Sequence, residues 1–552
     1  QEAQLWHWVS SLRRGRPQLR WLMLGGLGSK LVVWLLLALS SRTQAYPSYN
    51  ELYYQQALDH FDPSSQVRWP HRYLLNNASW DGRGKLANGC RGPILLYAGN
   101  EGNIEDFWAS NGFMVDVLAP ALGALLLFPE ERFYGRSLPC GASSSGPGTS
   151  PIGANCLRYL TTAQVIEDYV ELLFHLRETL PGAADCPAVA FGGSYGGTLA
   201  ALLRASRPSA VAGALAASSE LGYYDAAGWV AHGVDEFTFE DIVLRDYAEA
   251  HPHCLAALRA AVAAVDVADE AELVEKFHVC EPRALGPRRS DLFAYALEGL
   301  PQMDYPYAIG FMPAWPVRRA CEILVKATVV EEEDRGSSAR AKTQQLVEAA
   351  AEVTIMALGH NRPSLNDCIP YLGPGGPGNT PGDGPSSDPP DPWGWQSCTE
   401  TLHQFSAHGI RNFTFSLDRA IEQCKGLYGA GVRPDTAALA RMYGGFALAN
   451  GSAGVRNLIW SHGTLDPWGG WFRDVGPAPT GSAVYHFLME GAAHHLDLRG
   501  PHPADPPAVT ATRLKEAELI RSWIEEAAGA AKAAPAGAAQ HDVDTSRAEF
   551  LV

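Results

Sequence analysis

The sequence predicts an α/β fold in which a largely helical segment interrupts a mostly parallel sheet. Short apolar runs alternate with helical segments up to about residue 220, a pattern typical of buried parallel strands. After residue 222 the pattern becomes helical and rich in cysteine, and the alternation resumes near residue 457. Because loops at strand ends tolerate insertions, one α/β domain can close around the helical segment.

The predicted strands are apolar runs with turn residues at both ends. They cover 94–98, 124–128, 188–191, 211–217, 457–461 and 483–489. Thr161 and Gln164 predict a capping box. The helix that follows has an apolar face from Ile166 to Phe174, and a later helix is predicted over 508–526.

Composition bounds the class of protein and its partners. The chain has 552 residues, 46% hydrophobic and 19% charged, which is typical of a globular protein large enough for two structural units. A net charge of -17 argues against a nucleic-acid partner. The predicted boundaries are 1–45 for a signal peptide or signal anchor, 46–221 and 426–526 for the two parts of the α/β domain, 222–425 for the helical cap and 527–552 for a disordered tail.

The first 45 residues predict entry into the secretory pathway. Basic residues between Arg13 and Lys30 precede a short apolar run over 31–39, and an acceptable cleavage site ends at Ala45. A signal anchor starting near Trp21 is the alternative, but Lys30 and three glycines interrupt that longer run. We expect cleavage, and no stable membrane association after it.

Cysteines and glycosylation sequons favour the same compartment. The ten cysteines contain no C-x-x-C pair, which argues against zinc or thioredoxin-like sites. Six lie in the cap and predict a disulfide-bonded unit: Cys254, Cys280, Cys321, Cys368, Cys398 and Cys424. The pairing of Cys90, Cys140, Cys156 and Cys186 stays open. Sequons at Asn77, Asn412 and Asn450 are glycosylation acceptors if the chain is secreted.

Gly-Gly-Ser-Tyr-Gly-Gly at 192–197 is the strongest chemical signal. It lies between a predicted strand and a predicted helix, which is the context of a nucleophile elbow. Glycines permit the sharp turn because they lack a Cβ. Ser194 is then the candidate nucleophile, and the N–H of Tyr195 would face a developing oxyanion. The alternative is a structural glycine turn.

Ser194 needs a base and an acid, and both follow predicted strands. Asp466 comes after the strand at 457–461, and His494 comes after the strand at 483–489. The order Ser194, Asp466, His494 is that of the α/β-hydrolase fold. A turn-forming Asp-Pro and a structural His pair are the alternatives, and His462 is a rival base that breaks the order. No metal-ligand spacing accompanies these residues, so no metal is expected.

A second oxyanion donor is expected from an early loop that follows a strand. Gly99 and Asn100, directly after the predicted strand at 94–98, have that position. A plain turn is the alternative.

Five longer motifs resemble the prolylcarboxypeptidase and dipeptidyl peptidase II family. The resemblance covers roughly Tyr53 to Ile524. The motifs are Ala-Gly-Asn-Glu-Gly at 98–102, Arg-Phe-Tyr-Gly-Arg-Ser-Leu-Pro at 132–139, the elbow at 192–197, Leu-Asp-Pro-Trp at 465–468 and Gly-Ala-Ala-His-His-Leu-Asp-Leu-Arg at 491–499.

This resemblance implies a lysosomal or secreted serine exopeptidase that cuts next to proline. It implies an α/β-hydrolase domain with a helical cap, and a triad of Ser194, Asp466 and His494. His495 and Arg499 would support the relay. The remaining implied residues are Trp468 in the proline pocket and the disulfides Cys254–Cys321, Cys280–Cys368 and Cys398–Cys424.

Segments outside the triad resemble the carboxypeptidase branch more closely, at 175–183, 303–307, 312–316 and 442–445. An aspartate that the dipeptidyl branch is expected to carry after Cys368 is absent. Three departures from the family stand near the site: Glu131 replaces a histidine, Thr198 replaces a methionine expected to line the proline pocket, and Ser-Glu at 219–220 replaces Ala-Pro. Losing the apolar wall at Thr198 weakens the preference for proline.

The resulting expectation is a Pro-X carboxypeptidase that acts through an acyl-enzyme on peptide substrates, with no cofactor. It would work in a lysosome or vacuole, or outside the cell. A dipeptidyl peptidase is the runner-up, a non-catalytic binding protein and a lipase or esterase are further alternatives, and a homodimer is left open.

Overall fold

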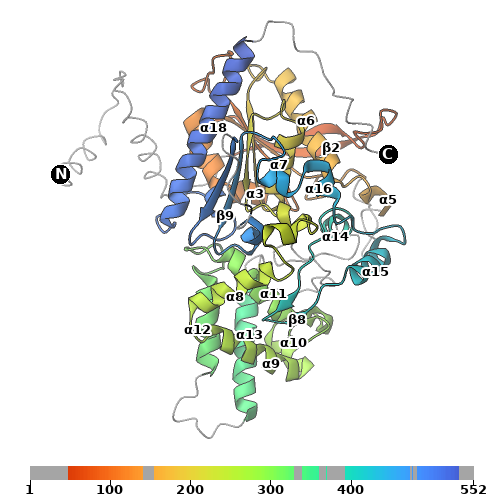
Figure 1. The fold of residues 1–552 in the computed structure, drawn as a ribbon, viewed down its shortest axis with the longest axis vertical. Coiled ribbons are helices and arrows are strands. Elements are labelled where there is room, and N and C mark those ends of the chain that lie inside the picture. The colour runs from red at the N-terminus through yellow and green to blue at the C-terminus, as the bar shows by residue number, and fades with distance from the viewer. Residues whose placement is uncertain are drawn as a thin grey trace, which may run out of the picture. The chain divides into compact units, whose positions relative to one another are not determined.

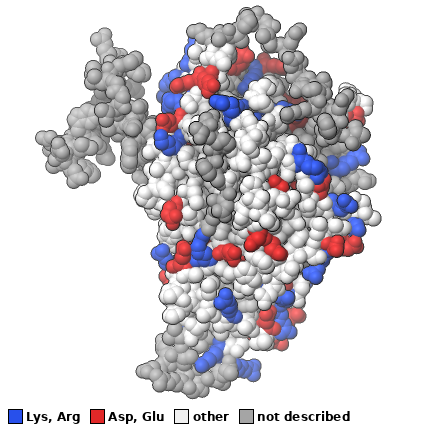
Figure 2. All heavy atoms as spheres, viewed as in Figure 1, with Lys and Arg blue, Asp and Glu red and all other residues white. Residues whose placement is uncertain are grey.

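A computed structural model describes residues 48–140, 154–328, 339–359, 368–369, 392–472, 475 and 482–533. The predicted signal segment at 1–45 lies outside the described residues, as does 534–552 of the predicted tail. None of the helices among the described residues is long and apolar enough to cross a bilayer. On the face drawn in Figure 2, basic and acidic side chains are interspersed.

An eight-stranded sheet runs through the α/β part (Figure 1), in the order β1-β2-β4-β3-β5-β6-β9-β10. β1 and β2 pair antiparallel, β2 joins β4 antiparallel, and every later pair in the sheet is parallel. The strands are β1 (Asn50–Ala57), β2 (Arg68–Asn76), β3 (Ile94–Tyr97), β4 (Leu125–Pro129), β5 (Ala188–Gly193), β6 (Gly213–Ala217), β9 (Leu458–Gly463) and β10 (Val484–Met489). This is the α/β-hydrolase fold.

The six predicted strands are confirmed as β3, β4, β5, β6, β9 and β10. β1 and β2 were not predicted. In β1 most side chains are exposed or half-buried, so the strand lacks the apolar run that marked the others.

The helices of this part flank the sheet, and Figure 1 shows α18 lying along it. They are α3 (Ile104–Ser110), the π-helix Phe113–Leu118, α4 (Ala119–Leu122), α5 (Ala154–Leu157), α6 (Thr162–Thr179), α7 (Tyr195–Ser206) and α18 (Pro507–Ala533). Short 3₁₀ turns follow β9 and β10 at Pro467–Phe472 and Leu496–Leu498.

The structure tests three details of the predicted helices. Thr161 caps α6, its hydroxyl accepting from the N–H of Gln164, but the predicted capping box is not completed: the side chain of Gln164 accepts from the N–H of His60 and donates to Asp59. Phe174 was wrongly assigned to the buried face: it is 39% exposed, and the guanidinium of Arg177 lies over its ring. α18 also runs to Ala533, so the first residues assigned to a disordered tail are helical.

The chain between β6 and β9 is the inserted segment, and its described residues form helices and a small sheet. The two-stranded sheet pairs β7 (Ala407–His408) with β8 (Asn412–Phe413). The α-helices are α8 (Thr238–Ala250), α9 (Cys254–Val267), α10 (Glu270–Lys276), α11 (Asp291–Gly299), α12 (Pro316–Thr328), α13 (Ala339–Gly359), α14 (Pro392–Ser397), α15 (Leu417–Tyr428), α16 (Ala438–Tyr443) and α17 (Phe446–Ala449). Short 3₁₀ turns lie at Leu221–Tyr224, Trp229–His232, Pro282–Leu285 and Pro301–Met303. α8, α9, α12 and α13 lie side by side in Figure 1.

Five disulfides tie the described chain together. Three join the inserted segment internally, Cys254–Cys321, Cys280–Cys368 and Cys398–Cys424. These are the pairs that the family resemblance implies. The two pairs that the sequence left open, Cys90–Cys186 and Cys140–Cys156, lie in the α/β part.

The central strands form the core that positions the site. Every residue of β3 and β5 is buried, and Leu96 of β3 has no exposed surface. We expect Leu96→Ala to lower the free energy of unfolding by ~2–5 kcal/mol, because a buried cavity replaces the side chain. Chemical denaturation measures this change.

Leu52 on β1 is the matched control, because it is 36% exposed on the same sheet. Leu52→Ala is expected to change the free energy of unfolding by less than ~0.5 kcal/mol. Equal losses for the two leucines would contradict the placement of β3 in the core.

Candidate active site

Ser194 occupies a sharp turn between β5 and α7. Its backbone has φ 61° and ψ -132°, a conformation that costs a non-glycine residue energy and is associated with functional sites. The turn is held because the N–H of Ser194 donates to the carbonyl of Ala217 at 2.9 Å. A Cβ added at Gly192 would stand 1.9 Å from the carbonyl oxygen of Gly196. The turn therefore needs glycine at position 192, and it presents the serine at the end of β5.

Asp466 and His494 are joined beyond the ends of β9 and β10. The Nδ1 of His494 lies 3.0 Å from both carboxylate oxygens of Asp466, and both side chains are buried. The N–H of Trp468 also donates to Asp466 at 3.1 Å. An imidazole held this way at Nδ1 keeps Nε2 free for proton transfer.

The backbone of His494 is fixed from the inserted segment. Its N–H donates to the carbonyl of Gln302 at 3.1 Å, and its carbonyl accepts from the hydroxyl of Tyr305 at 3.0 Å. Arg499 stacks over the ring of Tyr305, with 4.3 Å between the guanidinium carbon and the ring centroid. Arg499 therefore contacts His494 indirectly, by packing on Tyr305, whose hydroxyl donates to the carbonyl of His494.

His495 lies under the elbow. Its ring is 4.4 Å from that of His494, and a Cβ at Gly193 would contact its ring carbons at 3.0 Å. Its N–H donates to the hydroxyl of Ser218 at 2.7 Å. Burial lowers the pKa of His495 well below its ordinary value, so the ring is neutral. It acts as a neutral packing partner of His494 and of the elbow.

The hydroxyl of Ser194 donates to Glu220, at 2.8 Å from Oε1. Among the described residues it makes no hydrogen bond to His494. Glu220 follows β6 and is buried, and its Oε2 accepts from the hydroxyl of Tyr224 and lies 3.0 Å from Nε2 of His403. The structure thus brings together Asp466 with His494, and Ser194 with a carboxylate that the sequence flagged only as a departure from the family.

The loop after β3 lies against the elbow. A Cβ at Gly196 would contact the carbonyl oxygen of Ala98 and the side chain of Asn100 at about 3 Å. The amide of Asn100 is buried and reaches the carbonyl of Gly193 at 3.5 Å. Gly99 has no room for a Cβ, which would stand 2.1 Å from the carbonyl oxygen of Pro129. Gly99 and Asn100 are thus adjacent to the turn that carries Ser194 and Tyr195.

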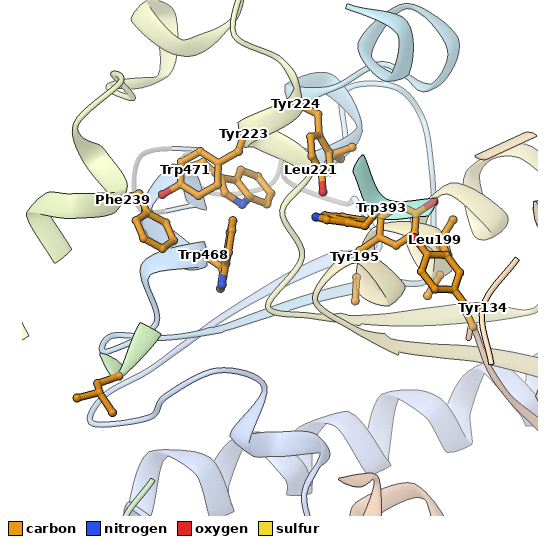
Figure 3. Close-up of a cluster of buried hydrophobic side chains, with 14 of the residues drawn as sticks. Tyr134, Tyr195, Leu199, Leu221, Tyr223, Tyr224, Phe239, Trp393, Trp468 and Trp471 are labelled. Atoms are coloured by element: carbon orange, nitrogen blue, oxygen red, sulfur yellow. The ribbon is translucent and has the colours of Figure 1, made fainter. Parts of the chain in front are cut away.

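Trp468 belongs to an aromatic cluster at the same end of the sheet. Figure 3 shows its indole beside Phe239 and Tyr223, whose ring centroids lie 4.8 and 6.3 Å from it. His403 is 5.1 Å away, between this cluster and Glu220. Flat apolar rings of this kind suit a rigid apolar ring in a substrate.

Thr198 lies behind the elbow on α7. It is fully buried, and its hydroxyl lies 2.8 Å from that of Ser219, so two of the residues that depart from the family satisfy each other's hydrogen bonding. Neither leaves an unpaired hydroxyl in this part of the core.

A second network joins Tyr195 to the inserted segment. Gln396 of α14 donates to the hydroxyl of Tyr195 at 2.8 Å and to Glu131 at 3.1 Å. Its carbonyl accepts from the hydroxyl of Tyr134. Burial raises the pKa of Glu131 well above its ordinary value. Burial therefore favours the protonated, neutral form of Glu131.

Glu101, next to the loop at 99–100, is the third glutamate near the site. Burial, and after it the charge of Glu220, raises the pKa of Glu101 to about 7. Its Oε2 is buried without a hydrogen-bond partner. No sequence pattern singles out Glu101, because its raised pKa depends on its burial and on its distance from Glu220 in the folded chain.

The remaining candidates are the rival base His462, the three sequons and a possible metal site. His462 is fully buried and packs on Phe472 at 4.4 Å, and burial lowers its pKa to about 3. It is therefore unsuited to be the base. Among the sequons, Asn77 and Asn412 are exposed and Asn450 is half-buried. Within the described ranges, no group of three His, Cys, Asp or Glu residues could hold a metal ion.

Gly192→Ala tests the elbow. The new Cβ forces the turn to shift, and a misplacement of about 1 Å at a reacting group costs on the order of 100-fold in rate. Peptidase assays measure the loss. Gly426→Ala is the control, because a Cβ there, in the last turn of α15, meets no atom within 4 Å. Full activity of Gly192→Ala would contradict the turn as described.

Glu101→Gln tests the raised pKa. Between the ordinary value of about 4.3 and about 7, the folded state keeps a proton that the unfolded chain loses. The free energy of unfolding of the unchanged protein therefore falls as pH rises through that window. Glu101→Gln removes this fall, so denaturation series should show the variant gaining relative stability from pH 4.5 to 7.

Glu105→Gln is the opposite control, because Arg72 lowers the pKa of Glu105 in spite of its burial. Folding favours the ionised form of Glu105, so this variant loses relative stability as pH rises towards about 4.3 and then stays level between pH 4.5 and 7, where Glu101→Gln gains. Parallel pH profiles for the two variants would contradict the assignment of Glu101.

Comparison with known proteins agrees with the geometry. The lysosomal Pro-X carboxypeptidase of Mus musculus is 33% identical over 86% of this chain and 89% of its own length. The human protein of that name is 32% identical over 87% and 89%. The thymus-specific serine protease of Mus musculus is 25% identical over 86% and 87%. The model of the family described as "Serine carboxypeptidase S28" matches residues 56–516 of this chain. The chain belongs to this serine carboxypeptidase S28 family and is a serine peptidase.

Proposed function

We propose that the protein is a Pro-X carboxypeptidase, which releases the residue that follows a penultimate proline. The observation that carries this proposal is the hydrogen bond between Asp466 and His494, in a chain whose serine elbow carries Ser194. The chain is also similar to a Pro-X carboxypeptidase over most of its length. The aromatic cluster around Trp468 supports an apolar ring as the residue before the cleaved bond.

In the proposed reaction Ser194 attacks the carbonyl carbon of the cleaved bond and gives its proton to Nε2 of His494. Asp466 orients the ring and stabilises its positive charge. The N–H of Tyr195, with the loop at Gly99 and Asn100, holds the oxyanion. His494 then protonates the leaving amine, and water hydrolyses the acyl-enzyme.

The charges around Ser194 favour testing a second candidate, a dipeptidyl peptidase on the same scaffold. Glu220 touches the nucleophile, and Glu101 is close enough for the two charges to interact. Carboxylates attract the free ammonium of a peptide N-terminus and repel a free C-terminal carboxylate.

We further propose that the protein works in the secretory pathway or the lysosome. The five disulfides of the described chain are stable in an oxidising compartment, and two of the relatives reported above are named lysosomal.

A tripeptide with a central proline separates the two candidates, because both would cut the same bond. A carboxypeptidase should still cleave the N-acetylated peptide and lose activity on the C-terminal amide. A dipeptidyl peptidase should do the reverse. Mass spectrometry of the products decides. Ser194→Ala should abolish cleavage and labelling by a fluorophosphonate, and labelling that survives in this variant would sink the proposed nucleophile.

A further inference from the structure

We propose that Glu220 is a positioning residue that holds the hydroxyl of Ser194 away from His494 in the resting enzyme. The inference rests on the proposed role of Ser194 as nucleophile and adds a restraint to that site. The contact that carries it is the 2.8 Å hydrogen bond from the Ser194 hydroxyl to Oε1 of Glu220.

The backbone brings these two residues together. β5 and β6 are parallel neighbours, and the N–H of Ser194 donates to the last residue of β6, Ala217. Glu220 follows three residues later and is only 3% exposed. Its side chain therefore meets the nucleophile from the adjacent strand end, without any loop having to close.

The carboxylate is held in this position. Oε2 accepts from the hydroxyl of Tyr224 and lies 3.0 Å from Nε2 of His403. The ring of His403 in turn stacks on Tyr224 at 4.9 Å and on Phe405 at 5.2 Å. Glu220 cannot turn away from Ser194 without giving up both partners on its other oxygen.

The carboxylate is also ionised. Burial alone would raise the pKa of Glu220, but the contacts with His403, Tyr224 and Ser194 outweigh burial and lower it. A hydrogen bond to an ionised acceptor is roughly twice as strong as one between neutral groups. Glu220 is therefore a strong competitor for the single hydrogen of the serine hydroxyl.

A restraint of this kind has a kinetic consequence. Ser194 has to leave Glu220 before it can give its proton to His494. The bond to Glu220 is present in the free enzyme and in the substrate complex, and it is lost in the transition state. Removing it therefore raises kcat and leaves KM unchanged.

Glu220→Gln is the test, because glutamine keeps the shape and can satisfy all three partners. Its carbonyl accepts from Ser194, and its amide donates to Tyr224 and to a neutral His403. The weaker neutral bond should raise the rate of fluorophosphonate labelling and the kcat on the central-proline tripeptide roughly five- to tenfold. KM should stay within about twofold.

Tyr224→Phe is the matched control. It removes one bond to the same carboxylate but leaves the bond from Ser194 in place. A residue that served only the packing of this region would make the two variants behave alike. We expect Tyr224→Phe to leave the labelling rate within about twofold of the unchanged enzyme.

If Glu220→Gln does not fold, the combined variant Glu220→Leu, Tyr224→Phe and His403→Phe replaces the whole polar cluster with apolar groups of similar size. It should also label faster. If the folded variant labels at an unchanged or slower rate, and labelling still depends on Ser194, the proposed restraint by Glu220 is wrong. The proposed role of Ser194 as nucleophile is then unaffected. A slower rate would mean that Glu220 assists the proton transfer. Labelling that does not depend on Ser194 overturns both proposals.

Discussion

The strained backbone of Ser194 is the constraint on which the rest of the site depends. The turn is held by the bond from its N–H to Ala217 and by the absence of a side chain at Gly192. Strand β5 ends at this turn and helix α7 begins there, so the packing of the buried strand holds the strained backbone in place. The loop after β3 and the ring of His495 are placed by their contacts with the same turn.

The candidate catalytic residues belong to two separate hydrogen-bonded groups. Asp466 and His494 form one, held from the inserted segment by Gln302 and Tyr305. Ser194 and Glu220 form the other, held by Tyr224 and His403. In the proposed mechanism the first group receives the proton of the second, so the balance between the two sets the reactivity of the serine.

Much of this architecture could be predicted from the sequence, because it depends on local patterns. Apolar runs marked the buried strands, and the elbow glycines marked Ser194. Strand β1 could not be predicted because most of its side chains are exposed or half-buried, so it has no apolar run. The predicted C-terminal helix ends too early, at residue 526, because its last turns lack an apolar face. Those turns are rich in alanine, which favours helix even without an apolar face. The partner of the Ser194 hydroxyl could not be predicted, since it is set by neighbouring strand ends in three dimensions.

The contact between Gln396 and Tyr195 links two segments that are distant in the chain. Tyr195 follows the nucleophile directly, and Gln396 belongs to the short helix α14 of the inserted segment. Any sequence change that displaces α14 therefore also affects Tyr195, the residue whose N–H we propose as an oxyanion donor. Insertions or deletions near this helix, far from the catalytic side chains in sequence, give evolution a way to adjust turnover without altering a catalytic side chain.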